Sequence, residues 1–571
     1  MPSSSSTTTP TVNPSLRRRH ARLNAQVGLF KVTDGDGYEL RGFDIANITL
    51  VEGKSGWIVI DALTTARPRR RRWPSRATPR REDGERALVH AQPRRPLRRR
   101  ARCHHGRGTS GAQGARHRLG GLHGGVHQRE RDGRHRDGPA LARIAVRAQP
   151  RALGEGTVDY GLGKAVGYGT FDILKADDLI TSPPRSACST ACASCSTTCR
   201  APRRPAEMTF SIPNLQGLRR RLGANVHNLL PVRGAKVRDA LRWAAYMQVR
   251  STSSATPRST SASTTGRCGG ASASPAFITQ HRDVYKYTHD QTVRLINAGL
   301  TPNEIAEKVR LPKSLQTHFG ARGYYGDLRH NVKAVYQFYL GAYDGNPAHL
   351  DPLPPQDAAR RYVELAGGAD KAVQAAQAAF DKGEYRWAAE LLNHVVFADS
   401  GHAAAKELLA RTYDQLGFVA EAATWRNSYL TAAAELRQGP AKAGISRAAF
   451  LDMLAQTPIE RFLEAMAAGL DGPAAEGKAL KINLVLTDAK ESYRLWIENA
   501  VLHHRKAEPD PQADATLAVT KGFFVRMMAG TAGAKDLITS DEAKVSGSKI
   551  DLVRFLTLID KAPGTFAIVT K

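Results

Sequence analysis

The feature of this sequence that most restricts its folding is an arginine-rich window at residues 67–151. The window holds 25 Arg, no Lys and 6 acidic residues, and therefore carries +19 of the net +30 of the 571-residue chain. Its other residues are mainly Gly, Pro, Ala and His, without the hydrophobic periodicity of a helix or a strand. Because an unpaired charge is costly to bury, we expect residues 67–150 to be solvated and irregular.

Two further windows, Pro183–Pro205 and Val249–Pro275, are rich in Ser, Thr, Ala and Arg and almost lack large apolar residues. We predict no regular secondary structure for them. The segments around them have ordinary patterns: Gly42–Asp61 predicts two strands joined by a turn, and Ala235–Met247 predicts a helix. A GC-rich gene read in the wrong frame yields Arg, Pro, Ala, Gly and Ser, so we interpret the windows as stretches read out of frame.

Composition excludes several classes of protein. A hydrophobic share of 41% excludes a globally disordered chain, and 6 Cys are too few for a disulfide scaffold. No run of 18 or more apolar residues exists, so we expect no membrane span. The N-terminus lacks the apolar stretch of a secretory signal, which predicts a cytoplasmic location. The basic charge alone would suggest nucleic acid, but the arginine window has no interleaved aromatic residues, so we predict no nucleic-acid partner.

Two patterns in these windows imitate metal sites. Cys188, Cys192, Cys195 and Cys199 have a C-x3-C-x2-C-x3-C spacing, which by itself suits zinc or an iron–sulfur cluster. We interpret them as no metal site, because the surrounding window shows no structural pattern. The same interpretation applies to six His scattered among Arg and Gly, namely His104, His105, His117, His123, His127 and His135.

Residues 277–437 read as a helical domain. Thr288–Ala298 and Val332–Tyr343 predict helices, and Thr301–Glu304 predicts a capping box with Pro at the first helical position. Gly383 and Gly417 begin similar segments 34 residues apart, each predicted to lie between two amphipathic helices, as in tetratricopeptide pairs. Two such units cannot bury their apolar faces alone, so they should pack on neighbouring helices or on a second subunit.

Residues 446–571 read as a separate α+β domain. Its predicted strands are Leu480–Leu486, Tyr493–Glu498, Ala500–Arg505, Ala515–Val519 and Thr565–Val569, and its predicted helices are Ser446–Gly469, Gly522–Ala529 and Ile550–Ile559. We expect residues 277–571 to fold and associate independently, because their helix-capping residues and their hydrophobic periodicity indicate the same helices and strands.

The segments outside the windows resemble the alkyl sulfatases, a branch of the metallo-β-lactamase superfamily. The residues that carry this resemblance are GFDIANITLVEGKSGWIVIDALT (42–64), GTVDYGLGKAVGYGT (156–170), PAEMTF (205–210), HNLLPVRGAKVRDALRWAAYM (227–247), YKYTHDQTVRLINAGLTPNEIAE (285–307), RGYYGDLRHNVKAVYQFYLGAYDGNPAHLDPLP (322–354) and GEYRWAAELLNHVV (383–396).

The resemblance implies a multidomain α+β fold. A disordered N-terminus (1–26) would precede a degraded metallo-β-lactamase αββα sandwich (27–276). An all-α dimerisation domain with tetratricopeptide-like pairs (277–437) and a linker (438–445) would follow. The chain would end in an α+β domain similar to sterol carrier proteins (446–571), with an apolar groove for a fatty chain. Phe523, Phe524, Met527 and Met528 either line this groove or form core. The implied partner is a second copy of the chain, in a homodimer.

The implied reaction is hydrolysis of an alkyl sulfate ester to a fatty alcohol and sulfate, using two zinc ions per subunit and an H-x-H-x-D-H motif. This motif is missing, and the segments that carry the family's acidic ligands, 199–204 and 218–224, contain no acid. One codon choice for Ala91–Arg100, read one base later, encodes His-Ser-His-Val-Asp-His-Phe-Gly-Gly. One choice for Ser263–Gly269, read two bases later, encodes His-His-Trp-Pro-Val-Trp. We therefore place frameshifts at about 67–150, 183–204, 217–224 and 249–275, and we predict that the written chain binds no catalytic zinc pair.

Three residues of the implied substrate site survive. Arg233 matches an Arg whose forked donors suit sulfate oxygens, and His227 and Asn228 lie close to it in the sequence. Each also has a structural interpretation, as an ion-pair partner or a hydrogen-bonded loop residue. Two functions stay open: a zinc-dependent alkyl sulfatase that is inactive as written, or a non-catalytic, dimerising and lipid-binding remnant.

Overall fold

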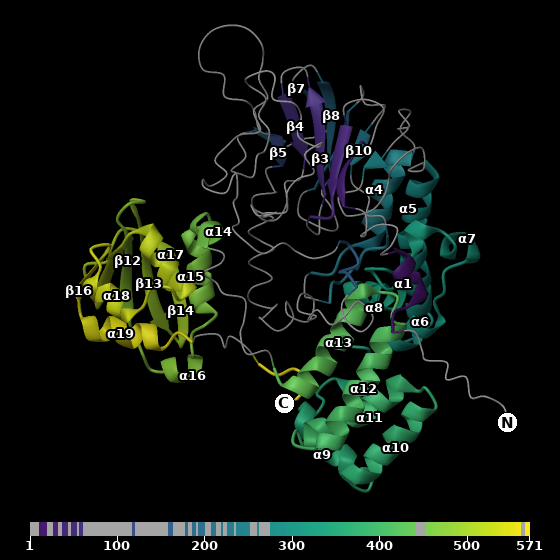
Figure 1. Cartoon of the computed structure of the whole chain (residues 1–571). Coiled ribbons are helices and arrows are strands. Elements are labelled where there is room, and N and C mark those ends of the chain that lie inside the picture. The colour runs from purple at the N-terminus through teal and green to yellow at the C-terminus, as the bar shows by residue number, and fades with distance from the viewer. Residues whose placement is uncertain are drawn as a thin grey trace, which may run out of the picture.

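A computed structural model of the chain describes residues 275–440, 451–560 and 566–570 continuously (Figure 1). Before them it describes fifteen shorter stretches: 11–19, 27–31, 37–43, 47–53, 56–60, 117–119, 158–163, 178–180, 185–189, 192–199, 207–212, 218–220, 225–232, 236–251 and 260–261. Apart from 117–119, the arginine window therefore lies outside the described residues.

The first sheet is an antiparallel meander of four strands in the order β1-β2-β3-β4. Its strands are β1 (Gly28–Lys31), β2 (Gly37–Arg41), β3 (Ile48–Gly53) and β4 (Gly56–Ile60). β3 and β4 pair from Thr49↔Ile60 to Gly53↔Gly56, which confirms the two strands predicted within Gly42–Asp61. In β2, Glu39 and Arg41 form a buried ion pair of 2.5 Å.

A second sheet has five strands in the order β11-β10-β9-β8-β7, and β5 pairs with β6 in a third. These strands are β5 (His117–Leu119), β6 (Asp178–Ile180), β7 (Arg185–Ser189), β8 (Cys192–Cys199), β9 (Glu207–Ile212), β10 (Leu218–Arg220) and β11 (Thr260–Ser261). The prediction of no regular structure was wrong for β5, β7, β8 and β11. Strand ladders form between backbone N–H and C=O groups, which Ser, Thr, Cys and Arg supply as well as apolar residues do, and Thr favours strands.

The N-terminus also differs from the prediction of disorder over 1–26. Residues Pro14–Arg19 form α1, in which Leu16 and Arg19 are completely buried. The Arg19 guanidinium donates to Asp159 at 2.5 Å and to the Gly161 carbonyl at 2.7 Å. Polar, Arg-rich sequence gave no sign of this burial, because the acidic partner lies 140 residues away.

The helical part follows the predicted order. Its elements are α4 (Ala240–Ser251), α5 (Pro275–Ile296), α6 (Pro302–Lys308), α7 (Lys313–Gln316), η3 (Phe319–Ala321), α8 (Leu328–Leu340), η4 (Pro347–His349), α9 (Pro355–Leu365), α10 (Ala369–Asp381), α11 (Tyr385–Ala398), α12 (Ala403–Val419) and α13 (Ala423–Gln438). The capping box is confirmed: Thr301 accepts from the Glu304 N–H, and Glu304 accepts from the Thr301 N–H at 2.8 Å.

The 34-residue repeat is confirmed at its first copy and displaced at its second. Gly383 lies in the turn between α10 and α11 as predicted, whereas Gly417 lies inside α12. A Cβ at Gly417 would lie 3.0 Å from a Leu430 methyl carbon. The missing side chain therefore permits close packing of α12 against α13 and does not serve a turn.

The C-terminal part forms a five-stranded sheet in the order β14-β13-β12-β15-β16, with helices packed on its apolar face (Figure 1). Its elements are α14 (Leu451–Ala455), α15 (Ile459–Ala467), α16 (Gly472–Ala475), β12 (Lys481–Leu486), β13 (Glu491–Glu498), β14 (Val501–Lys506), β15 (Ala515–Val519), α17 (Lys521–Ala529), α18 (Ala534–Thr539), β16 (Ala543–Gly547) and α19 (Lys549–Thr557). Four of the predicted strands are confirmed. β16 was missed because its apolar residues are small and few.

The predicted strand Thr565–Val569 was wrong. Residues 566–570 instead reach the helical part, where the backbone N–H groups of Ile568 and Val569 donate to Glu435 in α13 at 2.7 and 2.8 Å. Val569 packs against the core formed by α10–α13. A carboxylate therefore satisfies the donors that a neighbouring strand would otherwise have bonded.

Candidate functional site

The candidate substrate residues lie in the loop of residues 225–230, between the second sheet and α4. His227 and Asn228 are both buried, and the structure places them side by side in this loop. Arg233 lies outside the described residues. Two of the three predicted residues therefore have a described position, and both belong to the interior of the molecule.

Arg238 holds His227 and Asn228 together. Its guanidinium contacts His227 Nδ1 at 2.7 Å and also donates to the Asn228 carbonyl. That carbonyl lies 3.1 Å from the same Nδ1, so the three groups form one compact polar cluster. Arg238 is itself buried. No local pattern in the sequence marks Arg238, because an Arg next to Asp in a helix-initiating segment resembles an ordinary surface residue.

The backbone of the loop is held from the other side by Asn331 in α8. The Asn331 carbonyl oxygen accepts from the Leu229 N–H at 2.8 Å, and its amide donates to the His227 carbonyl at 3.0 Å. Asn228 donates to the Tyr325 carbonyl at 2.9 Å. A side chain added at Gly326 would collide with the His227 carbonyl, so close backbone contact also requires that glycine. Nothing in the sequence indicated these contacts, which span about one hundred residues.

The first turn of α8 also contacts the 225–230 loop. Asp327 is its N-cap and accepts from the His330 N–H at 3.2 Å. Burial raises the pKa of the Asp327 carboxyl above its ordinary value, opposed by hydrogen bonds from His330 and Arg329. Burial likewise lowers the pKa of His330, although its bond of 2.5 Å to the Leu230 carbonyl opposes this. A neutral His330 therefore ties α8 to the loop.

Aromatic rings surround His227. Its ring meets the Tyr325 ring edge-on at 4.6 Å, and Trp243 lies 5.7 Å away and stacks on Tyr285 at 4.6 Å. The Tyr285 hydroxyl accepts from the backbone N–H of His227 at 2.8 Å. Such surroundings exclude water and strengthen any electrostatic contact that His227 makes. The loop therefore has a hydrogen-bonded backbone and a buried imidazole enclosed by aromatic rings.

We expect Asn331→Ala to lower the free energy of unfolding by about 2 kcal/mol, because it leaves the buried Leu229 N–H and His227 carbonyl without this partner. Urea unfolding followed by tryptophan fluorescence measures the change. Gln337→Ala, on the exposed side of the same helix, is the matched control and should change stability little. Equal stability of the two variants would show that Asn331 does not hold the loop.

The described residues do not fit a zinc pair. Among them, no group of three or more His, Cys, Asp or Glu side chains is placed to hold a metal ion. His227, His281, His289 and His330 are described, but each makes hydrogen bonds within the protein and none lies in a set of ligands. Nearly all of the scattered His and all four Cys side chains of the windows lie outside what the structure describes. The prediction that the written chain binds no zinc pair stays a prediction.

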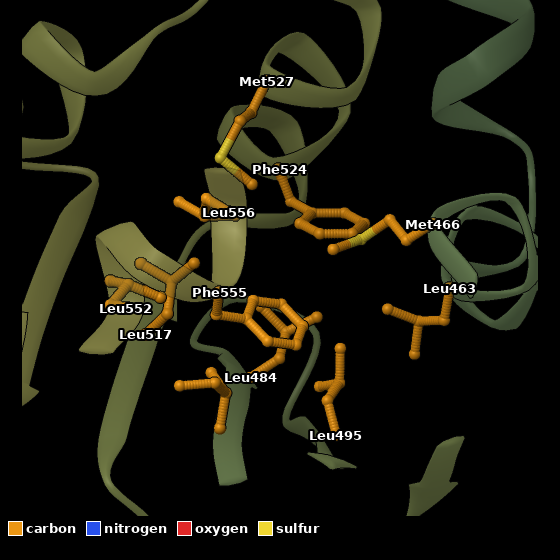
Figure 2. A pocket seen from close by; sticks show the side chains of 11 residues that line it. Leu463, Met466, Leu484, Leu495, Leu517, Phe524, Met527, Leu552, Phe555 and Leu556 are labelled. Atoms are coloured by element: carbon orange, nitrogen blue, oxygen red, sulfur yellow. The ribbon is translucent and has the colours of Figure 1, made fainter. Parts of the chain in front are cut away.

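A second candidate is an apolar cavity in the C-terminal part, between the sheet and α15, α17 and α19 (Figure 2). Its volume is about 20 Å³, close to what one water molecule needs. Phe524 and Met527 line it, whereas Phe523 is core and Met528 packs against the core from outside. An alkyl chain would enter only if side chains moved, and the unbranched Met466 and Met527 are the most adaptable of the lining residues.

In the part of the chain that is described, no helix has the length and apolarity to span a membrane.

Comparisons with known proteins agree over almost the whole chain. Residues 301–439 match the alkyl sulfatase dimerisation family, and residues 447–571 match the alkyl sulfatase C-terminal family. An alkyl/aryl-sulfatase of Saccharomyces cerevisiae is 33% identical, with 98% of this chain and 86% of that protein covered. A linear primary-alkylsulfatase of a Pseudomonas species is 34% identical, with 98% and 83% covered. The solved structure of a stereoselective inverting sec-alkylsulfatase from Pseudomonas superposes with a TM-score of 0.81 at 31% identity, covering 98% of this chain and 89% of that one.

Proposed function

Since the chain belongs to the alkyl sulfatase family, and is by family a sulfuric ester hydrolase, we propose that its substrates are alkyl sulfates such as dodecyl sulfate. The observation that carries the proposal is the agreement in sequence and fold over 98% of the chain with an alkylsulfatase. We further propose that the chain as written does not turn over. Release of inorganic sulfate from dodecyl sulfate, with and without a reinstated metal motif, tests both statements.

Zinc dependence belongs to this proposal and rests on the family resemblance. The H-x-H-x-D-H motif is missing from the sequence, and the described residues provide no ligand set in its place. When bound, a zinc pair would supply an activated water. Without suitable ligands, the residues of this chain can bind and orient an ester but have no such water to attack it.

We place the sulfate next to the 225–230 loop. Arg233 would bind two sulfate oxygens through its forked donors, and His227 would offer its Nε2–H. The support for this assignment is the contact with Arg238, which holds the His227 ring in place, together with the buried hydrogen bonds that keep Asn228 and the loop backbone in place. This arrangement acts only on binding, so it would persist in a chain without activity.

The alternative, a dimerising and lipid-binding remnant, is favoured by the intact C-terminal half. Residues 277–437 as a dimerisation domain, 438–445 as a linker and 446–571 as a domain similar to sterol carrier proteins are the proposed units, after a degraded αββα sandwich at 27–276. The two family models and the separate apolar cores of α10–α13 and of β12–α19 support this division.

We expect the chain to be a homodimer. The dimerisation family model matches residues 301–439, which expose large apolar side chains at the end of α8 and beyond it: Phe338, Tyr339, Leu340, Tyr343, Leu350 and Leu353. A second copy would cover such a patch. Light scattering should give a molar mass of twice the 62.0 kDa of one chain. The double variant Leu350→Glu with Leu353→Glu should give the mass of a single chain.

The matched control for this dimer test is Gln374→Glu with Ala375→Glu, two exposed positions on α10 that carry the same added charge. The control should remain a dimer. A parent chain of 62.0 kDa in solution would remove the dimer proposal, and a dimeric leucine variant would move the interface to another face.

A further inference from the structure

The outer face of the C-terminal sheet is cationic. The apolar face carries Leu484, Leu495 and Leu517 against the helices, so the alternating residues point to the other side. Lys481, Arg505 and Lys544 are exposed there, and Arg494 is partly exposed. On the same side of the sheet lie the acids Glu498, Asp510 and Asp514. Asp510 is 3.9 Å from Arg494, and the Asp514 carboxylate accepts from the Lys481 backbone N–H at 2.7 Å. Four cations against three acids leave a small excess of positive charge on the face.

The register of the strands places like charges together. Arg494 in β13 lies directly opposite Arg505 in β14, and like charges opposite each other destabilise a sheet. The structure shows no carboxylate bonded to the side chains of Lys481, Arg505 or Lys544 among the described residues. An external anion would relieve this repulsion, which the protein's own acids do not fully neutralise.

An aromatic and apolar element lies within this charge. Trp496 stacks on His503 across the strands, with ring centroids 5.2 Å apart and planes at 20°, and its indole N–H donates to Glu498 at 3.3 Å. Val501, at the end of the same face, is 50% exposed. A fixed indole with neighbouring cations is the combination that favours the boundary between anionic headgroups and apolar chains.

The face is also hollowed. A polar groove of about 360 Å³ opens between the loop after β14 and the strands β15 and β16, lined by Asn483, Pro509, Asp510, Pro511, Ala513, Thr516, Ser546 and Gly547. Asn483 is buried, and its side-chain amide donates to the Asp510 carbonyl at 2.9 Å and to the Thr516 hydroxyl at 3.0 Å. The groove is therefore a hydrogen-bonded polar surface on a sheet face that none of the described helices covers.

We propose that this face, centred on Lys481, Trp496 and Arg505, docks the protein on the headgroup surface of an aggregate of alkyl sulfates. The choice of alkyl sulfate as the anionic amphiphile rests on the proposed function. Single-stranded nucleic acid fits less well, because His503 already covers one side of the Trp496 ring, and the described residues of this sheet face include no further exposed aromatic ring for the next base. Docking would keep the protein where its proposed substrate is concentrated.

Lysine acylation read by mass spectrometry tests the proposal on the full chain. The arginine window contains no Lys, so acylation of Lys481 and Lys544 reports contact at this face and not contact at the window. Vesicles of phosphatidylcholine with about one third hexadecyl sulfate should slow acylation of Lys481 and Lys544 about fivefold, whereas pure phosphatidylcholine should not. Lys535 and Lys549, on the helical side, are the internal controls and should react as in buffer.

Arg505→Gln gives an independent arm. This variant removes one cation of the Arg494–Arg505 pair, so it should weaken vesicle binding about fivefold. The urea concentration at the unfolding midpoint should stay unchanged or rise, because the repulsion between the two Arg is lost. Lys549→Gln, with the same loss of charge on the other side, should bind as the parent does. Binding without protection of Lys481 and Lys544, equal protection on neutral vesicles, or stronger protection by a single-stranded oligonucleotide would each overturn the proposal. None of these outcomes depends on hydrolysis, which the proposed function already denies to this chain.

Discussion

Purified as its sequence stands, the protein is expected to hold much less than one zinc ion per chain and to release sulfate from dodecyl sulfate no faster than buffer does. The reason is the absence of the H-x-H-x-D-H motif, together with segments 199–204 and 218–224 that contain no acid. A dinuclear site needs ligands of the right type in the right geometry. Elemental analysis and ion chromatography of sulfate measure both quantities. Two tightly held zinc ions with hydrolysis would refute the prediction.

The matching variant is a chain whose windows at about 67–150, 183–204, 217–224 and 249–275 are translated in the alternative frame. It should bind two zinc ions per chain and release sulfate at least about a millionfold faster than the uncatalysed reaction, a normal enhancement for an enzyme. The control is the same chain with the reinstated Asp of the motif changed to Asn, which should lose most of the rate. Resequencing the gene across codons 66–275 tests the frame hypothesis independently of either protein.

The sequence predicted those parts of the fold whose signals are local. The capping box at Thr301–Glu304 and the strands β12 to β15 follow from caps and alternation, which need only nearby residues. The prediction failed for β7 and β8, because side-chain composition says little about whether backbone groups find a partner strand. It also failed at α1, where the decisive contact joins Arg19 to a residue 140 positions away.

The candidate site shows the same division. The family resemblance predicts His227 and Asn228 as substrate residues, which stays a prediction, whereas Arg238 and Asn331, which hold their loop, carry no sequence signal of their own. Their roles depend on how α4 and α8 pack against the loop. A site residue that contacts a ligand can be predicted by resemblance, whereas a residue that supports it through a backbone carbonyl can be recognised only from the packed structure.

The second large effect is expected at the buried ion pair that attaches the N-terminal helix. Both side chains of Arg19 and Asp159 are completely buried, 2.5 Å apart. Arg19→Met removes one charge and leaves Asp159 buried without its cation, which should lower the free energy of unfolding by about 3–5 kcal/mol. Urea unfolding followed by tryptophan fluorescence measures the loss. Arg18→Met, one residue earlier and exposed, should change stability by less than about 0.5 kcal/mol.

A double variant separates the pair from the packing of the helix. Arg19→Met with Asp159→Leu removes both charges and retains bulk, so it should be more stable than Arg19→Met alone, because the cost of the single change lies mainly in the uncompensated carboxylate. Asp159 also accepts from the Gly161 N–H at 2.6 Å, so the double variant should not recover fully. If Arg19→Met is as stable as Arg18→Met, α1 is not held by this ion pair. If the double variant is the least stable of the three, packing around the pair contributes more than its charges do.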